Sequence, residues 1–148
     1  MHDRDPAVFF DVFKEIGIIE QLSRAILEAR LPDGLIAPHF AVLNHLTVRG
    51  DGRTPMEMAR AFQLPKTSMT HTIKALERHM LVAVRANPED GRSKCVWLTQ
   101  AGRDVRAQAI AGLGPDFAAL AQGFDVEQLR AILPVLTDLR QFLDAARD

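Results

Sequence analysis

The order of elements predicted between residues 54 and 98 constrains the fold of this chain more than any other feature. The run Thr54-Pro55-Met56-Glu57 is a capping sequence and predicts the start of a short helix, and Gln63-Leu64-Pro65 predicts a turn after it. A second helix is predicted over about 66–80, because apolar residues spaced by four, three and four form one buried stripe: Met69, Ile73, Leu76 and Met80. Two β-prone runs, 81–86 and 93–98, then predict a hairpin with its turn at Asp90-Gly91.

Long helices are predicted on both sides of this segment. One covers Val8 to Leu27 after Pro6, and another covers about Pro38 to Val48. After the hairpin, Thr99 caps a helix that breaks at Gly114-Pro115, with a further helical stretch over 116–121. A last helix follows Asp125, with a kink at Pro134. The chain is therefore predicted to be mainly α, a winged helix-turn-helix with a small β-hairpin wing. Within residues 1–148, the segments 1–36 and 115–148 are expected to flank a central region, 37–114, that holds the winged helix-turn-helix and a linker helix.

The distribution of charge points to a polyanionic partner, although the net charge of the chain is only −1. Residues 53–106 carry ten Lys and Arg against five Asp and Glu, whereas the segments on either side each have more acidic than basic residues. A basic middle third is typical of a nucleic-acid-binding module, and an ordinary solvated surface with uneven charge is the alternative.

The predicted second helix has a polar face opposite its apolar stripe. Its members are short hydrogen-bonding or basic side chains that suit base edges and phosphates in a major groove: Lys66, Thr67, Ser68, Thr70, His71, Lys74 and Arg78. The wing adds Arg92, which can enter a narrow minor groove, and Lys94. A solvated helix face is the alternative, and the following hairpin favours double-stranded DNA as the partner.

The other sequence features exclude several classes of protein. The 148 residues suit a single domain, and one cysteine suits a reducing compartment, so a cytoplasmic protein without disulfides is expected. No stretch predicts a signal peptide or a membrane span. The pairs His39/His45 and His71/His79 lack the spacing of two metal ligands on one helix face. No catalytic motif surrounds Ser68 and His71, so no enzymatic activity, metal or cofactor is expected.

The wing and its surroundings resemble the MarR family of winged helix-turn-helix transcriptional regulators. The run Asp90-Gly91-Arg92-Ser93-Lys94-Cys95-Val96-Trp97-Leu98-Thr99, followed by Gly102, resembles that family's Asp-x-Arg wing and Leu-Thr-x-x-Gly helix start. Residues 64–82 are similar to its recognition helix. Two positions depart from the family pattern. Met80 replaces a common Gly, which predicts a helix end without a left-handed Gly, and Pro65 replaces a capping Ser or Thr.

This resemblance implies a homodimeric, sequence-specific DNA-binding repressor or activator, with a repressor released by a small aromatic or phenolic effector as the main expectation. Its terminal helices would be the dimerisation helices, and the wide apolar faces of 6–30 and 125–146 support a second chain independently. A monomer that packs these helices on each other is one alternative, and a winged-helix dimer that binds a protein is another.

Four further residues receive weaker predictions. Asp90 is expected to steady the wing by pairing with a nearby Arg. His39 and His45 are expected to be surface histidines or to line an effector site. Cys95 is expected to be a small apolar group in a strand, with a redox-active thiol as the alternative.

Overall fold

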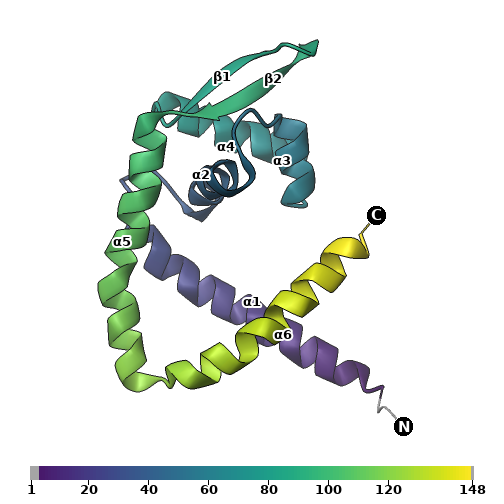
Figure 1. The fold of residues 1–148 in the computed structure, drawn as a ribbon, viewed down its shortest axis with the longest axis vertical. Helices are drawn as coiled ribbons and strands as arrows, with labels where there is room; N and C mark the ends of the chain where they lie inside the picture. The colour runs from purple at the N-terminus through teal and green to yellow at the C-terminus, as the bar shows by residue number, and fades with distance from the viewer. Residues whose placement is uncertain (1–3, 148) are drawn as a thin grey trace. The chain divides into compact units, whose positions relative to one another are not determined.

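The computed structural model describes residues 4–147, and within them the chain is mainly helical, as predicted. Figure 1 shows the helices and the single hairpin. In chain order the elements are α1 (Pro6–Glu28), α2 (Ala37–Arg49), α3 (Pro55–Ala61), α4 (Lys66–Arg78), β1 (Val82–Asn87), β2 (Asp90–Leu98), α5 (Gln100–Gly123) and α6 (Val126–Ala145). No helix among the described residues is long and apolar enough to cross a membrane.

The chain forms two compact units, residues 1–113 and 114–148. The first unit contains α1 to α4, the hairpin and the first part of α5, and the second contains the rest of α5 and α6. Residues 1–3 and 148, at the ends of the predicted terminal segments 1–36 and 115–148, lie outside the described residues. The dimerisation role of those segments stays a prediction.

The core of the first unit lies among α2, α3, α4 and the base of the hairpin, which Figure 1 shows grouped together. Its fully buried large side chains come from all of these elements: Val42, Leu43, Leu46, Met58, Met69, Leu76 and Val96. Burying each such side chain stabilises the fold by roughly 1.5–3 kcal/mol. Three of the four residues in the predicted stripe of α4, Met69, Ile73 and Leu76, are buried in this core.

The hairpin has the predicted strands but not the predicted turn. Its regular ladder runs from Val82 opposite Leu98 to Ala86 opposite Lys94. The turn is at Pro88 and Glu89 rather than at Asp90-Gly91, and a register shift follows Ala86. The side chain of Asn87 explains the difference, because its Oδ1 accepts a hydrogen bond from the Glu89 N–H at 3.0 Å and so forms an Asx turn before Asp90 is reached.

The end of α4 also differs from the prediction, because Met80 is not part of the buried stripe. The helix ends at Arg78, and Met80 has φ 59° and is 74% exposed. The Met80 N–H donates to the Glu77 carbonyl at 2.9 Å, and the Leu81 N–H donates to the Leu76 carbonyl at 3.0 Å. These bonds form a Schellman motif, in which a left-handed residue ends the helix. The helix end therefore does require the left-handed conformation, which Met80 adopts in place of glycine.

The predicted break in α5 is wrong, because the helix runs without interruption from Gln100 to Gly123 and includes Pro115. A proline ring disfavours the helical conformation of the residue before it by clashing with that residue's N–H and Cβ. Gly114 precedes Pro115 and has no Cβ, so the Cβ part of this clash is absent. The last helix, α6, starts as predicted, with the Asp125 carboxylate accepting the Glu127 N–H at 2.9 Å.

Candidate nucleic-acid interface

The polar face of α4 is exposed to solvent because its other face is anchored in the core. Most side chains predicted to face DNA are exposed, with Thr70 half-buried; the exposed ones are Lys66, Thr67, Ser68, His71 and Lys74. A tight turn between α3 and α4 fixes the angle of the second helix, with Gln63 at φ 54° and the Leu64 N–H donating to the Ala59 carbonyl at 2.9 Å. The geometry of a helix-turn-helix is therefore present, with the polar face of its second helix outward.

The start of α4 has the unusual cap that the sequence predicted. Pro65 occupies the N-cap position and makes no side-chain capping bond. The first backbone N–H groups of a helix have no partner within the helix, and they can donate to phosphate oxygens. The exposed first turn of α4, Lys66 to Ser68, combines such groups with a Lys and two hydroxyls.

The wing displays two basic side chains on β2, because both Arg92 and Lys94 are exposed. Arg92 lies in the irregular part of the strand beyond the regular ladder. The Asp90 carboxylate accepts a hydrogen bond from the backbone N–H of Arg92 at 3.0 Å, in place of the expected pairing with an Arg side chain. Asp90 therefore shapes the backbone at Arg92. Arg85, on β1 opposite Cys95, is a further exposed basic residue that was predicted only as part of the basic segment.

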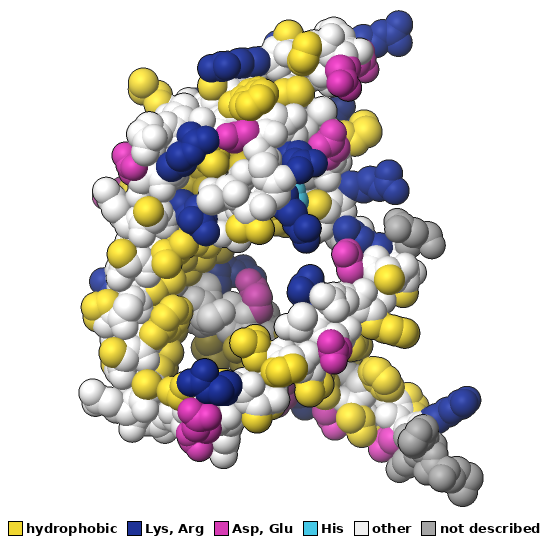
Figure 2. All heavy atoms as spheres, in the orientation of Figure 1, with side chains coloured by type: hydrophobic (Ala, Val, Ile, Leu, Met, Phe, Trp, Pro, Cys, Tyr) yellow, Lys and Arg dark blue, Asp and Glu magenta, His cyan; other side chains and the backbone are white. Residues whose placement is uncertain are grey.

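Figure 2 shows where the charged side chains gather on one face of the molecule. Lys and Arg side chains project from the winged-helix segment, whereas hydrophobic side chains are exposed along the long helices. This distribution agrees with the basic character of residues 53–106. The arrangement suits a polyanion on the winged helix and an apolar partner on the long helices.

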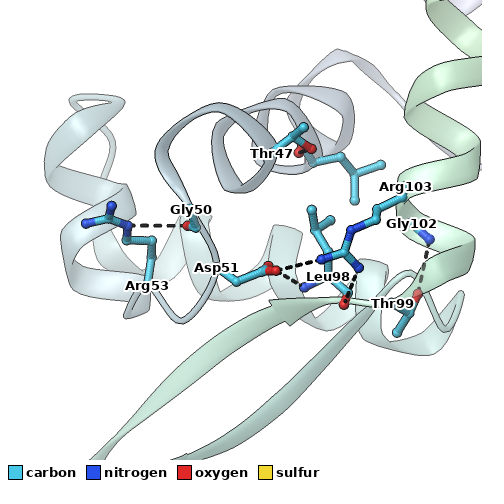
Figure 3. A network of polar contacts seen from close by, with 9 residues as sticks. Thr47, Gly50, Asp51, Arg53, Leu98, Thr99, Gly102 and Arg103 are labelled. Carbon is cyan, nitrogen blue, oxygen red and sulfur yellow. Dashed lines mark hydrogen bonds and ion pairs between the residues drawn. The ribbon is translucent and has the colours of Figure 1, made fainter.

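The root of the wing is held by polar contacts that the sequence did not predict (Figure 3). Asp51, in the loop after α2, accepts a hydrogen bond from the Leu98 N–H at 2.7 Å and pairs with Arg103 of α5 at 2.8 Å. Arg103 also donates to the Leu98 carbonyl at 3.3 Å. We call these three residues the wing clamp. Asp51 and Arg103 are 52 residues apart, so no local pattern could have signalled their contact.

The same loop adds a short third segment to the hairpin. The Gly52 N–H donates to the Val96 carbonyl, and the Val96 N–H donates to the Arg53 carbonyl, both at 2.9 Å. Gly52 has φ 79°, and a Cβ there would lie 3.0 Å from the ring of Trp97. Trp97 therefore packs directly on the loop that carries Asp51.

Thr99 joins the wing to α5. Its hydroxyl donates to the Met80 carbonyl at 2.8 Å and accepts from the Gly102 N–H at 3.1 Å, which confirms that Thr99 caps the helix. Its own N–H donates to the Leu81 carbonyl at 3.1 Å. These bonds hold the start of α5 close to the point where the chain leaves α4.

The two histidines of α2 lie inside the first unit. His39 is buried, and its Nδ1 accepts a hydrogen bond from the Ile36 N–H at 2.8 Å. Burial lowers the pKa of His39 below its ordinary value of 6.5, and nearby His79, His71 and Arg78 lower it further. His45 is half-buried against Phe62, with ring centroids 5.2 Å apart, and burial lowers its pKa as well. His39 is thus not a surface residue, and effector binding by either histidine stays a prediction.

The lone thiol, Cys95, is buried in β2, where it occupies the place of a small apolar group.

Comparison with known proteins finds a family model that matches part of the chain. The sequence model of the MarR family matches residues 33–93, which cover α2 to α4 and most of the wing. A MarR transcriptional regulator from Methanosarcina mazei Go1 has a similar fold, with a TM-score of 0.76 and 21% identity over 88% of this chain and 94% of the other.

Two further structures have the same fold. A mutant of MarR from E. coli in complex with operator DNA matches with a TM-score of 0.73 and 21% identity, covering 88% of this chain and 94% of the other. BpsR from Bordetella bronchiseptica, whose DNA binding is regulated by 6-hydroxynicotinic acid, matches with a TM-score of 0.71 and 24% identity, covering 88% and 98%. Residues 33–93 therefore match the model of the MarR family, and the chain has the fold of these MarR regulators.

Proposed function

We propose that this protein is a sequence-specific transcriptional regulator that binds double-stranded DNA. The observation that carries the proposal is the exposed polar face of α4 beside a wing that displays Arg92 and Lys94. The hydroxyls, imidazole and ammonium groups of α4 would contact base edges and phosphates in the major groove. Arg92 would enter the adjacent minor groove, where a narrow A·T-rich stretch attracts a guanidinium. No catalytic role is proposed.

The protein would act as a homodimer through its long helices. Large apolar side chains are exposed along α1, among them Phe9, Phe13 and Leu22, and along α6, among them Leu129, Leu136 and Phe142. Monomers rarely leave large apolar faces in water, so a second copy is proposed to cover the apolar face of each of these helices. Two α4 helices would then read half-sites about ten base pairs apart, roughly 34 Å, in a palindromic operator.

A small aromatic or phenolic molecule is proposed to release a repressor of this kind from its operator. Support comes from the structural relative BpsR, whose DNA binding 6-hydroxynicotinic acid regulates. His39 and His45 are the proposed effector-lining residues, since both belong to α2, which packs against α1 and α4.

The experiment that tests DNA binding is selection from a random duplex library, followed by fluorescence anisotropy on the enriched sequence at several salt concentrations. A regulator should enrich a palindrome and lose affinity steeply as salt rises, because bound phosphates release counterions. Failure to enrich any sequence, together with weak binding that is equal for all duplexes, would favour a winged helix that binds a protein. Light scattering on the same sample should give twice the 16.4 kDa mass of the chain.

A further inference from the structure

We propose that Asp51 and Arg103 are positioning residues that hold the wing in the orientation in which it contacts DNA. They contact Leu98, at the root of β2, and hold it through both of its backbone polar groups. This inference rests on the proposed function for its DNA readout. Its structural part, the orientation of the wing relative to α4, is tested without DNA.

The wing clamp joins three separate parts of the first unit. Asp51 comes from the loop after α2, Leu98 is the last residue of β2, and Arg103 is in the first turn of α5. The Asp51 carboxylate uses one oxygen for the Leu98 N–H and the other for Arg103, at 2.7 and 2.8 Å. The guanidinium closes the triangle by donating to the Leu98 carbonyl. A backbone unit held in this way cannot rotate without breaking a charge-assisted hydrogen bond.

The wing needs this support because of its length. Two strands alone form a marginal structure, and the regular ladder extends from the buried root at Val82 and Leu98 to the exposed Lys94. At roughly 3.3 Å per residue, Lys94 lies about 13 Å from Leu98 along the strand. A tilt of about 10° at the root would therefore move Lys94 by about 2 Å, which is enough to lose a hydrogen bond to DNA.

Global stability is a poor explanation for the pair. The Arg103 side chain is 47% exposed and that of Asp51 is 20% exposed. Ion pairs with this much contact with water contribute little to folding. The ion pair with Arg103 holds the Asp51 carboxylate against the Leu98 N–H, so its effect is on the position of the wing root rather than on folding stability.

The test compares Arg103→Met with Arg103→Lys, in the wild-type chain and in a wing-tip variant that carries Arg85→Ala, Arg92→Ala and Lys94→Ala. Arg103→Met should lower affinity for the selected operator about ten-fold in the wild-type chain. In the wing-tip variant the same change should cost less than about two-fold, because no basic wing side chain is left to misplace. Arg103→Lys, which keeps the pairing with Asp51, should restore most of the affinity. Arg106→Met removes the same charge one turn later, where the side chain bonds Asn44, and should cost about the same in both backgrounds.

A second measurement follows the wing without DNA. Trp97 is the single tryptophan of the chain and lies next to Leu98. Quenching of its fluorescence by acrylamide should increase in Arg103→Met and in Asp51→Asn, and should return toward the wild-type value in Arg103→Lys. Unchanged quenching in the first two variants, or equal losses of affinity in both backgrounds, would overturn the proposal. If the wild-type protein binds no duplex, the proposed function is wrong. If the quenching still changes as expected, the wing clamp nevertheless fixes the position of the wing root.

Discussion

The backbone of Gly102 lies against the carbonyl oxygen of Leu81, so closely that a Cβ at residue 102 would be 2.1 Å from that oxygen. Gly102→Ala should therefore force the first turn of α5 away from the hairpin root. We expect the free energy of unfolding to fall by about 1–3 kcal/mol, the usual cost of overpacking. Urea denaturation followed by circular dichroism would measure it.

The matched control is Gly17→Ala in the interior of α1, where nothing lies within 4 Å of the added Cβ. That change should stabilise the chain by roughly 0.5–1 kcal/mol, because alanine favours helix over glycine. Equal effects of the two substitutions would show that the Leu81 contact is not tight in solution.

Arg92→Ala should weaken operator binding by on the order of 1–3 kcal/mol and lower the salt dependence by about one ion. Its side chain is exposed, so thermal stability should change by no more than about 0.5 kcal/mol. Anisotropy titrations at several salt concentrations, with a melting curve for each variant, measure both quantities. Superimposable binding curves for wild type and Arg92→Ala would show that the wing is not part of the DNA interface.

Lys74→Ala tests α4 separately. If Lys74 contacts a phosphate, the loss of affinity should be similar for all duplexes, and if it reads a guanine, specificity should relax at one base position. Repeating the library selection with the variant distinguishes the two outcomes. Glu57→Ala is the control, since Glu57 is exposed on α3. A Lys74→Ala protein with wild-type affinity for every duplex would contradict the placement of α4 in the groove.

Met80→Gly should stabilise the protein by on the order of 0.5–1 kcal/mol. Met80 holds a left-handed conformation that costs a residue with a Cβ about 1–2 kcal/mol, and its exposed side chain loses little packing when removed. Glu77→Gly, inside the same helix, should instead destabilise by about 1 kcal/mol. Thermal melts of both variants give the comparison, and a Met80→Gly protein that is less stable than wild type would show that the methionine packs usefully.

Stability should fall as the pH decreases below about 6.5, in part through His39. The pKa of His39 is lowered in the folded protein. Below pH 6.5 its imidazole therefore becomes protonated in the unfolded chain while it stays neutral in the folded chain. The stabilisation that comes from neutral His39 is complete above pH 6.5 and is lost progressively as the pH falls toward the pKa of His39 in the folded state. In His39→Asn an amide oxygen can still accept the Ile36 N–H without titrating, so urea midpoints at pH 7.5 and 5.5 should differ less than in wild type. An identical pH dependence would mean that His39 is not a source of it.

Leu136→Glu, on the exposed apolar face of α6, should convert the proposed dimer to monomer at micromolar concentration. A charge placed in an apolar interface loses hydration without gaining a partner. Gln141→Glu, which is exposed on the other side of α6, is the control for one added negative charge. Light scattering that gives the same mass for wild type and Leu136→Glu would place the dimer contact elsewhere.

The sequence predicted those parts of the fold that have a local repeat. The four- and three-residue spacing of Met69, Ile73 and Leu76 identified the buried face of α4, and the β-prone composition of 81–86 and 93–98 identified the two strands of the wing. The helical period and the strand propensity are local properties, so one sequence is sufficient to detect them.

The features that sequence reasoning missed depend on single hydrogen bonds or on distant partners. The turn of the hairpin was misplaced because Asn87 forms its own side-chain turn, and α5 continued because glycine precedes Pro115. The pairing of Asp51 with Arg103 has no periodic signal. Such contacts appear only when the chain has folded and brought the two residues together.

Because Cys95 is buried, the rate at which its thiol reacts can be used to measure how often the root of the wing opens. A thiol reagent reaches this buried sulfur only when its surroundings open, so the rate of labelling under native conditions reports how often the hairpin opens at residue 95. Because residue 95 lies between the exposed Lys94 and the buried Val96, its labelling measures the opening of the hairpin at the boundary between the wing and the core.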